Sequence, residues 1–435
     1  MKLIITPSEL EKTVTIKING YKHSMVQIIA ASIILNQRTY IHNIPLVDDT
    51  FVMQNILRKI GCIFEIIDKT ILIDPNNIYS FNLDDEMCKK IHGSMYLFIA
   101  VGLRFGRIHY KESGGCQIGS EQDRGKRPFS HLVDVLDELG FSCAQKCDDY
   151  VFTSQKSPKT IDIKKYSDSE KQLEGALISS ATKASILIGC TLNEIEILNP
   201  YLKNDVLDLL DYIAKSGYLI TNSGKRLHIM KKNASKPSEI HFYLSDCVSE
   251  IISYTALSIM QNISLTLRVN NIRRIKKVLK PEISALKRMG VIYKYSHNTV
   301  VIIPPQEVKK INLKILHTTI QSDHHPFFAL ILTKGTGVST ITEYVWKNRF
   351  RYITELNKLG YIIKRVLNKI YIYPSQAFCG DVKVDGCDTR ATALLIIAAI
   401  STQANIEIEN ADHITRGYEN FIENLKNIGA NIEVR

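Results

Sequence analysis

The chain has 435 residues, of which 45% are hydrophobic and 23% charged, and this composition excludes a disordered or collagen-like protein. Its 55 Lys and Arg residues against 44 Asp and Glu residues give a formal charge of +11, which favours an anionic ligand, either nucleic acid or a phosphorylated small molecule. The length predicts two domains of roughly 200 residues each. No run of eighteen apolar residues and no apolar leader after a basic flank occurs, so we expect neither a membrane span nor a secretion signal.

The predicted elements repeat along the chain. In the first copy, an apolar helix over 28–35 precedes a strand over 38–43, and a second helix ends at Ile60 before strands at 62–67 and 70–73. Each copy of the second helix closes on a glycine, which is predicted to be a left-handed C-terminal cap. The intervals between these glycines are 69 to 79 residues. The glycines are Gly61, Gly140, Gly217, Gly290, Gly360 and Gly429.

Each copy therefore reads as strand, helix, strand, helix, strand, strand. Three such units pack into one domain if their helices are buried inside and their sheets face outward, so six units predict two similar α/β (α+β) domains. A long solenoid is the structural alternative, but solenoid periods usually fall between about 20 and 50 residues. The nine cysteines form no CxxC pair and no zinc-type spacing, and we expect most of them to be small buried side chains in a reducing cytoplasm.

Four motifs in this repeat resemble one family, the enolpyruvyl transferases, and most closely its branch that uses UDP-N-acetylglucosamine. The resemblance implies two inside-out α/β domains of three βαβαββ units each, with the active site in the cleft between them. It places the first domain at residues 21–236 and the second at 1–20 and 237–435. The motifs are NGYKHSMVQIIAA (19–31), GGCQIG (114–119) followed by Arg127-Pro128, TEYVWKNRF (342–350) and HITRGYE (413–419).

The resemblance implies a reaction in which the enolpyruvyl group of phosphoenolpyruvate moves to a hydroxyl of an acceptor and phosphate is released. Phosphoenolpyruvate carries a carboxylate and a phosphate, and the planar fork of arginine can bind two such oxygens at once. By motif position, Lys22, Arg127 and Arg416 are expected to bind phosphoenolpyruvate, while Arg349 and Arg390 are expected to be further arginines of the cleft. We expect no cofactor and no metal.

Cys116 matches the family cysteine that lies over phosphoenolpyruvate, where it donates a proton or aids product release and is the target of fosfomycin. The structural alternative is a flexible turn with a buried cysteine. Asp246 matches an acid of the second domain at the cleft, although a helix N-cap explains it equally well. Trp346, within the third motif, is expected to contact the substrate.

Two family positions are changed here. His23 stands where the family has Asn, and His92 stands where an arginine is expected; both are retained as substrate-binding candidates. The family's aspartate base corresponds to Asp323 only if the helix after it starts two residues later than the usual spacing predicts. His324 or His325 could replace it, because imidazole titrates near neutral pH. A metal site from these three is less favoured, since adjacent residues rarely point at one ion.

The acceptor is the least determined part of the interpretation. Gln172 and the segment Phe129-Ser130-His131-Leu132 resemble the shikimate branch, 5-enolpyruvylshikimate-3-phosphate synthase, more than the UDP-sugar branch. Our leading hypothesis is a cytoplasmic, monomeric transferase that acts on UDP-N-acetylglucosamine for peptidoglycan synthesis. The alternatives are another nucleotide or shikimate 3-phosphate as acceptor, an inactive relative that only binds ligand, and an RNA-binding or RNA-end-processing protein on a related repeat. We do not expect a membrane partner, and nucleic acid is the less favoured ligand.

Overall fold

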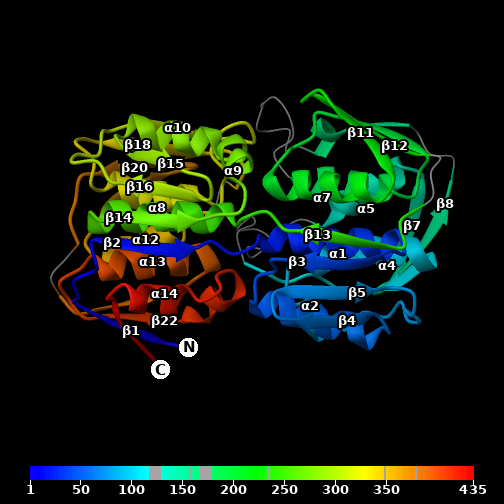
Figure 1. Ribbon diagram of the computed structural model, residues 1–435, viewed down its shortest axis with the longest axis horizontal. Helices are drawn as coiled ribbons and strands as arrows, with labels where there is room; N and C mark the ends of the chain where they lie inside the picture. The colour runs from blue at the N-terminus through cyan, green and yellow to red at the C-terminus, as the bar shows by residue number, and fades with distance from the viewer. Residues whose placement is uncertain (117–128, 156–158, 167–178, 233–235, 347–348, 378–379) are drawn as a thin grey trace. The chain divides into compact units, whose positions relative to one another are not determined.

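The computed structural model describes residues 1–435 except for 117–128, 156–158, 167–178, 233–235, 347–348 and 378–379. Contacts between residues divide the chain into two compact units (Figure 1). Unit 1 holds Met1–Asn19 and Asp246–Arg435, and unit 2 holds Gly20–Cys116 and continues to Ser245. None of the helices in the described part of the chain has the length and apolar character needed to cross a bilayer.

The predicted repeat is present in both units. Each copy runs from a strand through a buried helix to a second strand, then through an outer helix to a hairpin, except that a single bridge residue, Asn82, takes the place of the first strand in the second copy. All six glycines that were expected to cap the outer helices have a positive φ, between 81° and 103°. An L-residue rarely adopts this backbone conformation, so glycine is the residue that ends each outer helix.

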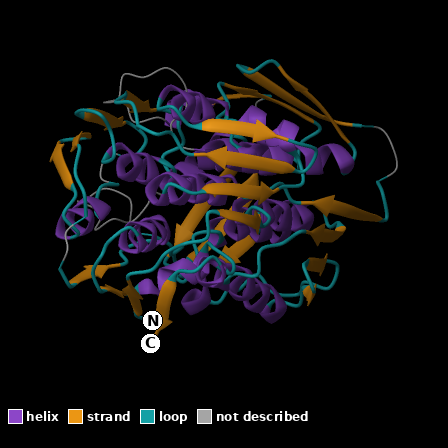
Figure 2. Cartoon of the chain, turned by 60° about the vertical axis from the view of Figure 1, so that its left-hand side comes forward, coloured by secondary structure: helices purple, strands orange, loops and turns teal. Residues whose placement is uncertain are grey.

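Three helices lie at the centre of each unit and contact one another. They are buried on most of their surface, as expected of a helix surrounded by protein, and every residue of α11 and α13 is buried. Figure 2 shows strands bordering the helices. The central helices are α1 (Lys22–Ile34), α4 (Ser94–Phe105) and α6 (Ser179–Gly189) in unit 2, and α8 (Val248–Gln261), α11 (His325–Leu332) and α13 (Thr389–Ile400) in unit 1.

The remaining helices pack on one side only, so their apolar residues form a stripe rather than a full surface. Those of unit 2 are α2 (Asp48–Lys59), α3 (Asp85–Cys88), α5 (Ser130–Glu138), α7 (Asn204–Lys215) and the 3-10 turn η1 (Ile163–Tyr166). Those of unit 1 are α9 (Ile272–Val278), α10 (Lys280–Arg288), α12 (Tyr352–Lys358), α14 (Phe421–Asn427) and the 3-10 turn η3 (Ala411–Arg416).

Unit 2 has two four-stranded sheets and one three-stranded sheet among its described residues, and each complete sheet combines one parallel pair with antiparallel pairs. In the three-stranded sheet, a single parallel bridge between Asn82 and His109 stands where the fourth strand would be. In spatial order, the sheets are β13 (Glu239–Tyr243), β3 (Arg38–His42), β5 (Thr70–Asp74), β4 (Ile63–Ile67); β6 (Arg107–His109), β8 (Asp149–Ser154), β7 (Phe141–Lys146); and β11 (Tyr218–Asn222), β12 (Arg226–Lys231), β10 (Glu194–Leu198), β9 (Thr160–Asp162).

The described strands of unit 1 form three four-stranded sheets of the same design. In spatial order, they are β15 (Ile292–Tyr295), β16 (Thr299–Ile303), β14 (Ser264–Arg268), β2 (Thr13–Lys17); β17 (Asn312–Ile315), β18 (Ser339–Glu343), β20 (Lys369–Tyr373), β19 (Ile362–Val366); and β21 (Val382–Asp385), β22 (Ile406–Glu409), β1 (Leu3–Thr6), β23 (Asn431–Val434).

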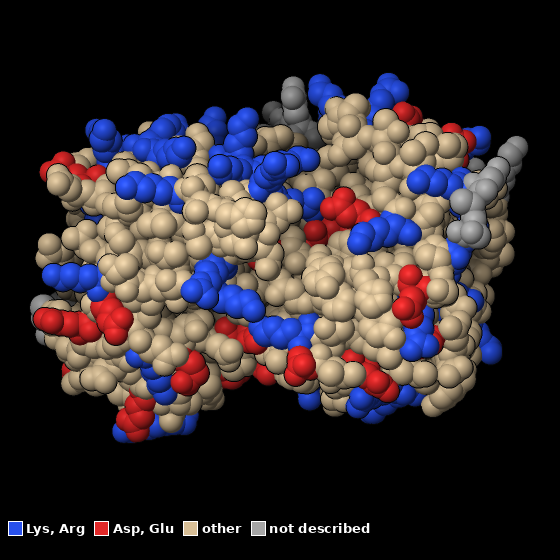
Figure 3. All heavy atoms as spheres, in the orientation of Figure 1, with Lys and Arg blue, Asp and Glu red and all other residues tan. Residues whose placement is uncertain are grey.

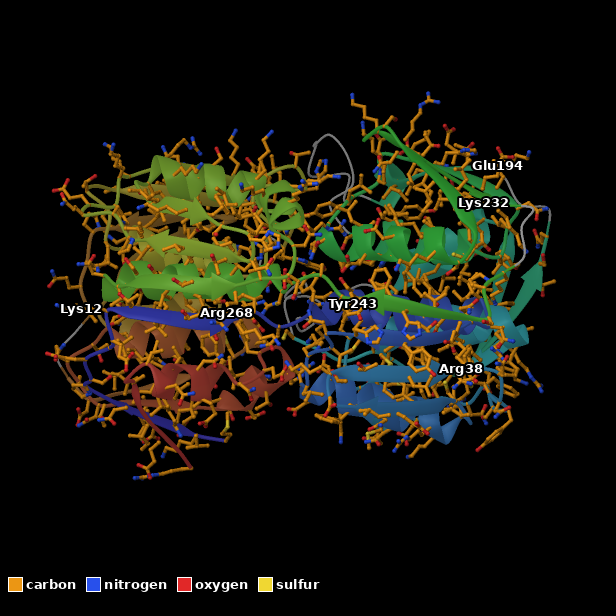
Figure 4. All side chains as sticks on the ribbon, viewed as in Figure 1. Lys12, Arg38, Glu194, Lys232, Tyr243 and Arg268 are labelled. Carbon is orange, nitrogen blue, oxygen red and sulfur yellow. The ribbon has the colours of Figure 1, made fainter. Side chains whose placement is uncertain are left out.

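Each of the two strands nearest the points where the chain passes between the units joins a sheet of one unit, although the helix that follows it belongs to the other unit. Strand β2 precedes α1 of unit 2 but pairs in parallel with β14 of unit 1, and β13 precedes α8 of unit 1 but pairs in parallel with β3 of unit 2. Figure 4 labels Arg268 at the end of β14, and Tyr243 and Arg38 on the β13–β3 pair. Contacts between residues place Met1–Asn19 in unit 1 and β13 in unit 2, so the boundary between the units lies at 245/246, whereas the sequence analysis expected a domain boundary at 236/237.

The surface of unit 1 carries a dense group of positive charges. On the face shown in Figure 3, Lys and Arg side chains gather over α9 and α10. The only acidic residue in these two helices, Glu282, is buried. Net charge therefore does not locate the anion site by itself, because part of the excess is on this exposed face. The exposed basic residues are Arg273, Lys276, Lys277, Lys280, Lys287 and Arg288.

Candidate active site

The glycine loop before Cys116 is fixed by close backbone packing. The amide of Gly114 donates to the carbonyls of Cys88 and Ile91, both at 3.2 Å. A Cβ on Gly114 would lie 1.5 Å from the carbonyl oxygen of Lys89, so no other residue fits there. Gly115 has a φ of 103°, a backbone conformation that residues with a side chain rarely adopt, so it favours glycine through its backbone rather than through crowding. The loop therefore holds the half-buried Cys116 at a defined place in unit 2.

Cys116 differs in surroundings from the structural cysteines of the chain. Burial raises the pKa of the Cys62, Cys88, Cys190 and Cys247 thiols to about 12, so these four remain protonated and unreactive at neutral pH. The cysteines in the described ranges form no disulfide. Four of the eight cysteines in the described ranges are buried, so the expectation that most of the nine act as small buried side chains holds for these four positions.

Lys22 and His23 form the first turn of α1, which is the positive end of the helix dipole. Cations are unfavourable at that end unless an anion accompanies them. Asp49, in the first turn of α2, supplies part of this compensation, because Lys22 Nζ lies 2.9 Å from Asp49 Oδ2. The His23 ring packs edge-on against Tyr21, with centroids 5.2 Å apart. A helix N-terminus that also carries two basic side chains is suited to binding an anion.

A buried ion pair lies on the neighbouring helices of unit 2. Lys183 on α6 and Asp205 in the first turn of α7 pair through Nζ and Oδ2, and their side chains are 7% and 1% exposed. We call Lys22, His23, Asp49, Lys183 and Asp205 the α1 cluster. His92, half-buried just before α4, belongs to unit 2 as well. Arg127 and Gln172 lie outside the described residues.

Unit 1 holds two buried arginines. Arg349 and Arg390 are each 6% exposed, and Arg349 Nη1 forms an ion pair with Asp323 Oδ1. Burial opposes the charge of Arg349, but Asp323 and Asp388 outweigh burial and raise its pKa, while Arg390 acts against them. Within the described residues, the Nε donor of Arg349 has no hydrogen-bond partner. A buried guanidinium with an unfilled donor is a ready site for an acceptor such as carboxylate or phosphate.

Arg390 lies in the first turn of α13, so unit 1 also places a cation at the positive end of a central helix. Asp388 caps this helix by accepting from the amides of Arg390 (2.8 Å) and Ala391 (3.1 Å). The guanidinium of Arg390 lies 5.0 Å from the centre of the Tyr418 ring, and Tyr418 is two residues beyond the half-buried Arg416. We call Asp323, Arg349, Asp388, Arg390 and Arg416 the arginine cluster.

Asp246 and Trp346 have mainly local roles in the described structure. Asp246 is 2% exposed, and its carboxylate accepts from the amides of Asn270 (2.9 Å) and Asn271 (3.1 Å) and from the side chain of Asn270. It anchors this loop, and the alternative that it caps α8 is wrong, because α8 begins at Val248 after Cys247. Trp346 is half-buried, and its amide donates to Glu343 at 3.0 Å.

The two histidines considered as replacement bases are enclosed. His324 and His325 are 0% exposed. His324 Nδ1 lies 2.9 Å from Glu282 Oε1, and His325 Nδ1 lies 2.8 Å from Glu343 Oε2. Helix α11 starts at His325, so Asp323 stands two residues before the helix. Of these three candidates, only Asp323 reaches partial exposure.

Some members of both clusters were missed by the sequence analysis. Asp388 could have been found, because an Asp directly before an apolar helix is a recognised N-cap signal. Asp49, Lys183 and Asp205 gave no comparable signal, since their partners lie far away in the sequence. No group of three or more His, Cys, Asp or Glu side chains in the described ranges is arranged to hold a metal ion.

Comparison with known proteins identifies relatives along the whole chain. Residues 4–425 match the family model for EPSP synthase (3-phosphoshikimate 1-carboxyvinyltransferase). A UDP-N-acetylglucosamine 1-carboxyvinyltransferase of Thermotoga maritima is 27% identical over 429 residues, covering 96% of this chain and 95% of the relative. The solved enolpyruvyl transferase NikO from Streptomyces tendae has a TM-score of 0.89 at 26% identity, covering 99% of this chain and 98% of its own. An EPSP synthase from Acinetobacter baumannii, at 14% identity and a TM-score of 0.74 over 100% of both chains, has the same fold.

Proposed function

Because the chain belongs to the EPSP synthase family of enolpyruvyl transferases, we propose that it moves the enolpyruvyl group of phosphoenolpyruvate to a hydroxyl of UDP-N-acetylglucosamine and releases phosphate. The reaction would serve peptidoglycan synthesis in the cytoplasm. Transfer from phosphoenolpyruvate to an acceptor is the family activity. The choice of UDP-N-acetylglucosamine is supported by the name of the Thermotoga relative, which matches the chain over nearly its full length.

One observation carries the assignment of phosphoenolpyruvate. Two buried arginines, Arg349 and Arg390, occur together in unit 1, and the Nε donor of Arg349 has no acceptor in the described residues. Uncompensated guanidinium donors in a buried site cost free energy unless an anion fills them. A small molecule with a carboxylate and a phosphate has the charge and the oxygens that such donors need.

We further propose that Lys22 in unit 2 and the arginines of unit 1 bind phosphoenolpyruvate. In this proposal, Cys116 donates the proton to C3 of phosphoenolpyruvate, and Asp323 stays ion-paired with Arg349 until the acceptor is bound. Binding of both ligands should then make the molecule more compact. Small-angle scattering with phosphoenolpyruvate and acceptor present tests this, and an unchanged radius of gyration would contradict it.

Two residues favour a second candidate acceptor. His23 and His92 replace an Asn and an Arg that the family resemblance leads us to expect, so two contacts to the acceptor are chemically different. Another nucleotide would keep the same transfer while changing these contacts, and shikimate 3-phosphate is the further option. The similarity in sequence and structure to the enolpyruvyl transferase NikO is compatible with either acceptor.

An acceptor screen tests the proposal. Release of phosphate from phosphoenolpyruvate would be measured with UDP-N-acetylglucosamine, with uridine monophosphate and with shikimate 3-phosphate, each against a control without acceptor. Phosphate release with UDP-N-acetylglucosamine alone supports the leading proposal. Release with uridine monophosphate or with shikimate 3-phosphate instead would identify that compound as the acceptor. No release with any of them would contradict the proposal and favour a relative that binds ligand without turnover.

A further inference from the structure

The ion pair of Lys183 and Asp205 has no part in the proposed function so far. It lies among the helices of unit 2, with Lys183 Nζ 5.6 Å from the centre of the Tyr96 ring on α4. Both side chains are almost fully buried. A buried ion pair is a poor way to stabilise a fold, because desolvation cancels most of the attraction and apolar residues of the same size serve as well. Another role is therefore to be expected of it.

One oxygen of the Asp205 carboxylate is unfilled. Lys183 takes Oδ2, whereas Oδ1 has no hydrogen-bond partner in the described part of the chain, although the side chain is 1% exposed. Burial favours the neutral acid, but Lys183, Lys203 and His23 outweigh it and lower the pKa of Asp205 to about 2. Asp205 is thus a charged, buried carboxylate with an acceptor position still to fill.

His23 is the neighbour that this carboxylate can orient. Helix α1, which begins with Lys22 and His23, packs against α7, which begins with Asn204 and Asp205. One side of the His23 ring contacts the buried Tyr21. The starts of both helices meet at Ser245, because the Tyr21 amide donates to its carbonyl at 2.9 Å and the Asn204 side chain donates to its Oγ at 2.7 Å. The charged groups at this end of the two helices include Lys22 with Asp49, Lys203 before α7, the Lys183–Asp205 pair, and Asp208, which accepts from Ser245.

The chemistry of position 23 makes this orientation significant. The family resemblance places an Asn there, and an amide cannot take up a proton near neutral pH, whereas imidazole can. The other base candidates are restricted: Asp323 is ion-paired with Arg349, and His324 and His325 are fully buried. A histidine whose ring is held by a carboxylate is an established arrangement for a general base.

We propose that Asp205, clamped by Lys183, is a positioning residue for His23, and that the His23 imidazole accepts the proton that the acceptor hydroxyl loses. This inference rests on the proposed function. The O–H bond of the acceptor breaks as its oxygen bonds to C2 of phosphoenolpyruvate, and the electron pair of the C2–C3 double bond takes a proton from Cys116. Phosphate then leaves with the electrons of its bond to C2, C3 returns its proton to Cys116 as the double bond re-forms, and His23 passes its proton to the phosphate.

The positioning role can be tested without turnover. Imidazole NMR would follow the titration of His23 in the full chain, with the His23→Asn variant used to assign its signal. Because Asp205→Asn alone leaves a buried unpaired lysine, the Lys183→Met/Asp205→Asn double variant is measured beside it. Asp205→Asn should lower the pKa of His23 by about one unit or more, whereas the double variant also removes the positive charge of Lys183 and should lower it less. An unchanged titration in both folded variants would overturn the positioning role.

Kinetics test the proton transfer. His23→Asn should lower kcat by about 100-fold or more. Lys183→Met/Asp205→Asn should lower kcat by about ten-fold and shift the acidic limb of its pH profile, and it should cause no further loss when combined with His23→Asn. Fully additive losses would contradict action through His23. Asp208→Asn, which changes another buried carboxylate of α7 that accepts from Ser245, is the matched control and should leave the His23 titration unchanged.

The two proposals fail in different ways. If the wild-type chain releases no phosphate with any acceptor, the proposed function and the proton-transfer role fail together, while the NMR titration still decides whether Asp205 positions His23. If phosphate is released and His23→Asn keeps full kcat at all pH values, the proposed function stands and the base assignment is overturned.

Discussion

Cys116 is held in place by two glycines that are required for different physical reasons. Gly115 needs a left-handed backbone, whereas Gly114 needs the absence of a side chain because the Lys89 carbonyl packs against it. The sequence motif predicted that glycine mattered here. It could not separate the two reasons, because the contact with Lys89 forms only in the folded chain.

Replacement of Cys116 tests its proposed role as proton donor. Cys116→Ala should lower kcat by about 100-fold or more, because a positioned acid is lost, whereas Cys116→Asp, which keeps an ionisable group, should retain much of the activity. Fosfomycin should inactivate the wild type and spare both variants. Phosphate release measures the effect, and Cys143→Ala, at a half-buried strand position, is the control. Full activity of both Cys116 variants, together with insensitivity of the wild type to fosfomycin, would limit the loop to a structural role.

Arg349 should bind phosphoenolpyruvate through its planar fork. Arg349→Lys keeps the positive charge but loses that geometry, so the KM for phosphoenolpyruvate should rise by about ten-fold to 100-fold, the equivalent of one charge-assisted hydrogen bond. The control is Arg351→Lys, because Arg351 is exposed and two residues away. Steady-state kinetics at saturating acceptor measure the change. A KM within two-fold of wild type would remove Arg349 from the binding site.

At this scale, motif matching proposes Lys22, Cys116, Arg349, Arg390 and Arg416 as site residues, but it gives no signal for the residues that contact them. Asp49 and Asp205 pair with cations from other helices, and no local spacing encodes such a contact. The sequence also could not predict that His324 and His325 are buried, because their contacts with Glu282 and Glu343 form only in the folded chain.

The helices and strands of the repeat were the most predictable elements. Their periodicity is local, and each outer helix ends at a glycine whose positive φ follows from the requirement for a left-handed cap. Less predictable was which sheet a strand joins. Strand β13 was expected in the second domain but pairs with β3 of unit 2, because parallel pairing is decided by packing rather than by the pattern within the strand.

Two cap glycines in unit 2 separate backbone strain from crowding. Gly61 and Gly217 have similar φ values of 95° and 98°, but a Cβ on Gly217 would meet nothing within 4 Å, whereas one on Gly61 would lie 2.6 Å from the Asn77 carbonyl. Gly217→Ala should therefore lower the free energy of unfolding by about 1–2 kcal/mol. Gly61→Ala should cost about 1–3 kcal/mol more, from overpacking. Urea unfolding measures both, and equal losses would contradict the distinction.

For the whole molecule, acid should weaken the fold through His131. Burial lowers the pKa of His131 to about 4, and its Nε2 lies 2.6 Å from Ser180 Oγ. Because the folded pKa is below the ordinary value of about 6.5, the unfolded chain binds the proton first. The stability that neutral His131 preserves is complete above pH 6.5 and falls by about 3 kcal/mol as the pH drops to 4.

His131→Gln should flatten this part of the stability profile, which urea unfolding at a series of pH values would record. The control is His297→Gln, because His297 is exposed and should have no influence on the slope. If His131→Gln retained the wild-type slope between pH 6.5 and 4, another buried group would be responsible.

The order in which the chain is synthesised determines when its N-terminal strands can pair. Strand β1 pairs with β22 on one side and β23 on the other, so both of its strand partners lie beyond residue 405. A ribosome completes the whole of unit 2 before it makes these partners, and domains generally fold as they emerge. Unit 2 can therefore fold with β13 in place before the strands that pair with β1 and β2 have been synthesised. A stalled or truncated product that lacks residues 406–434 would keep a finished unit 2 beside two exposed strand edges, which are the surfaces that chaperones and proteases recognise.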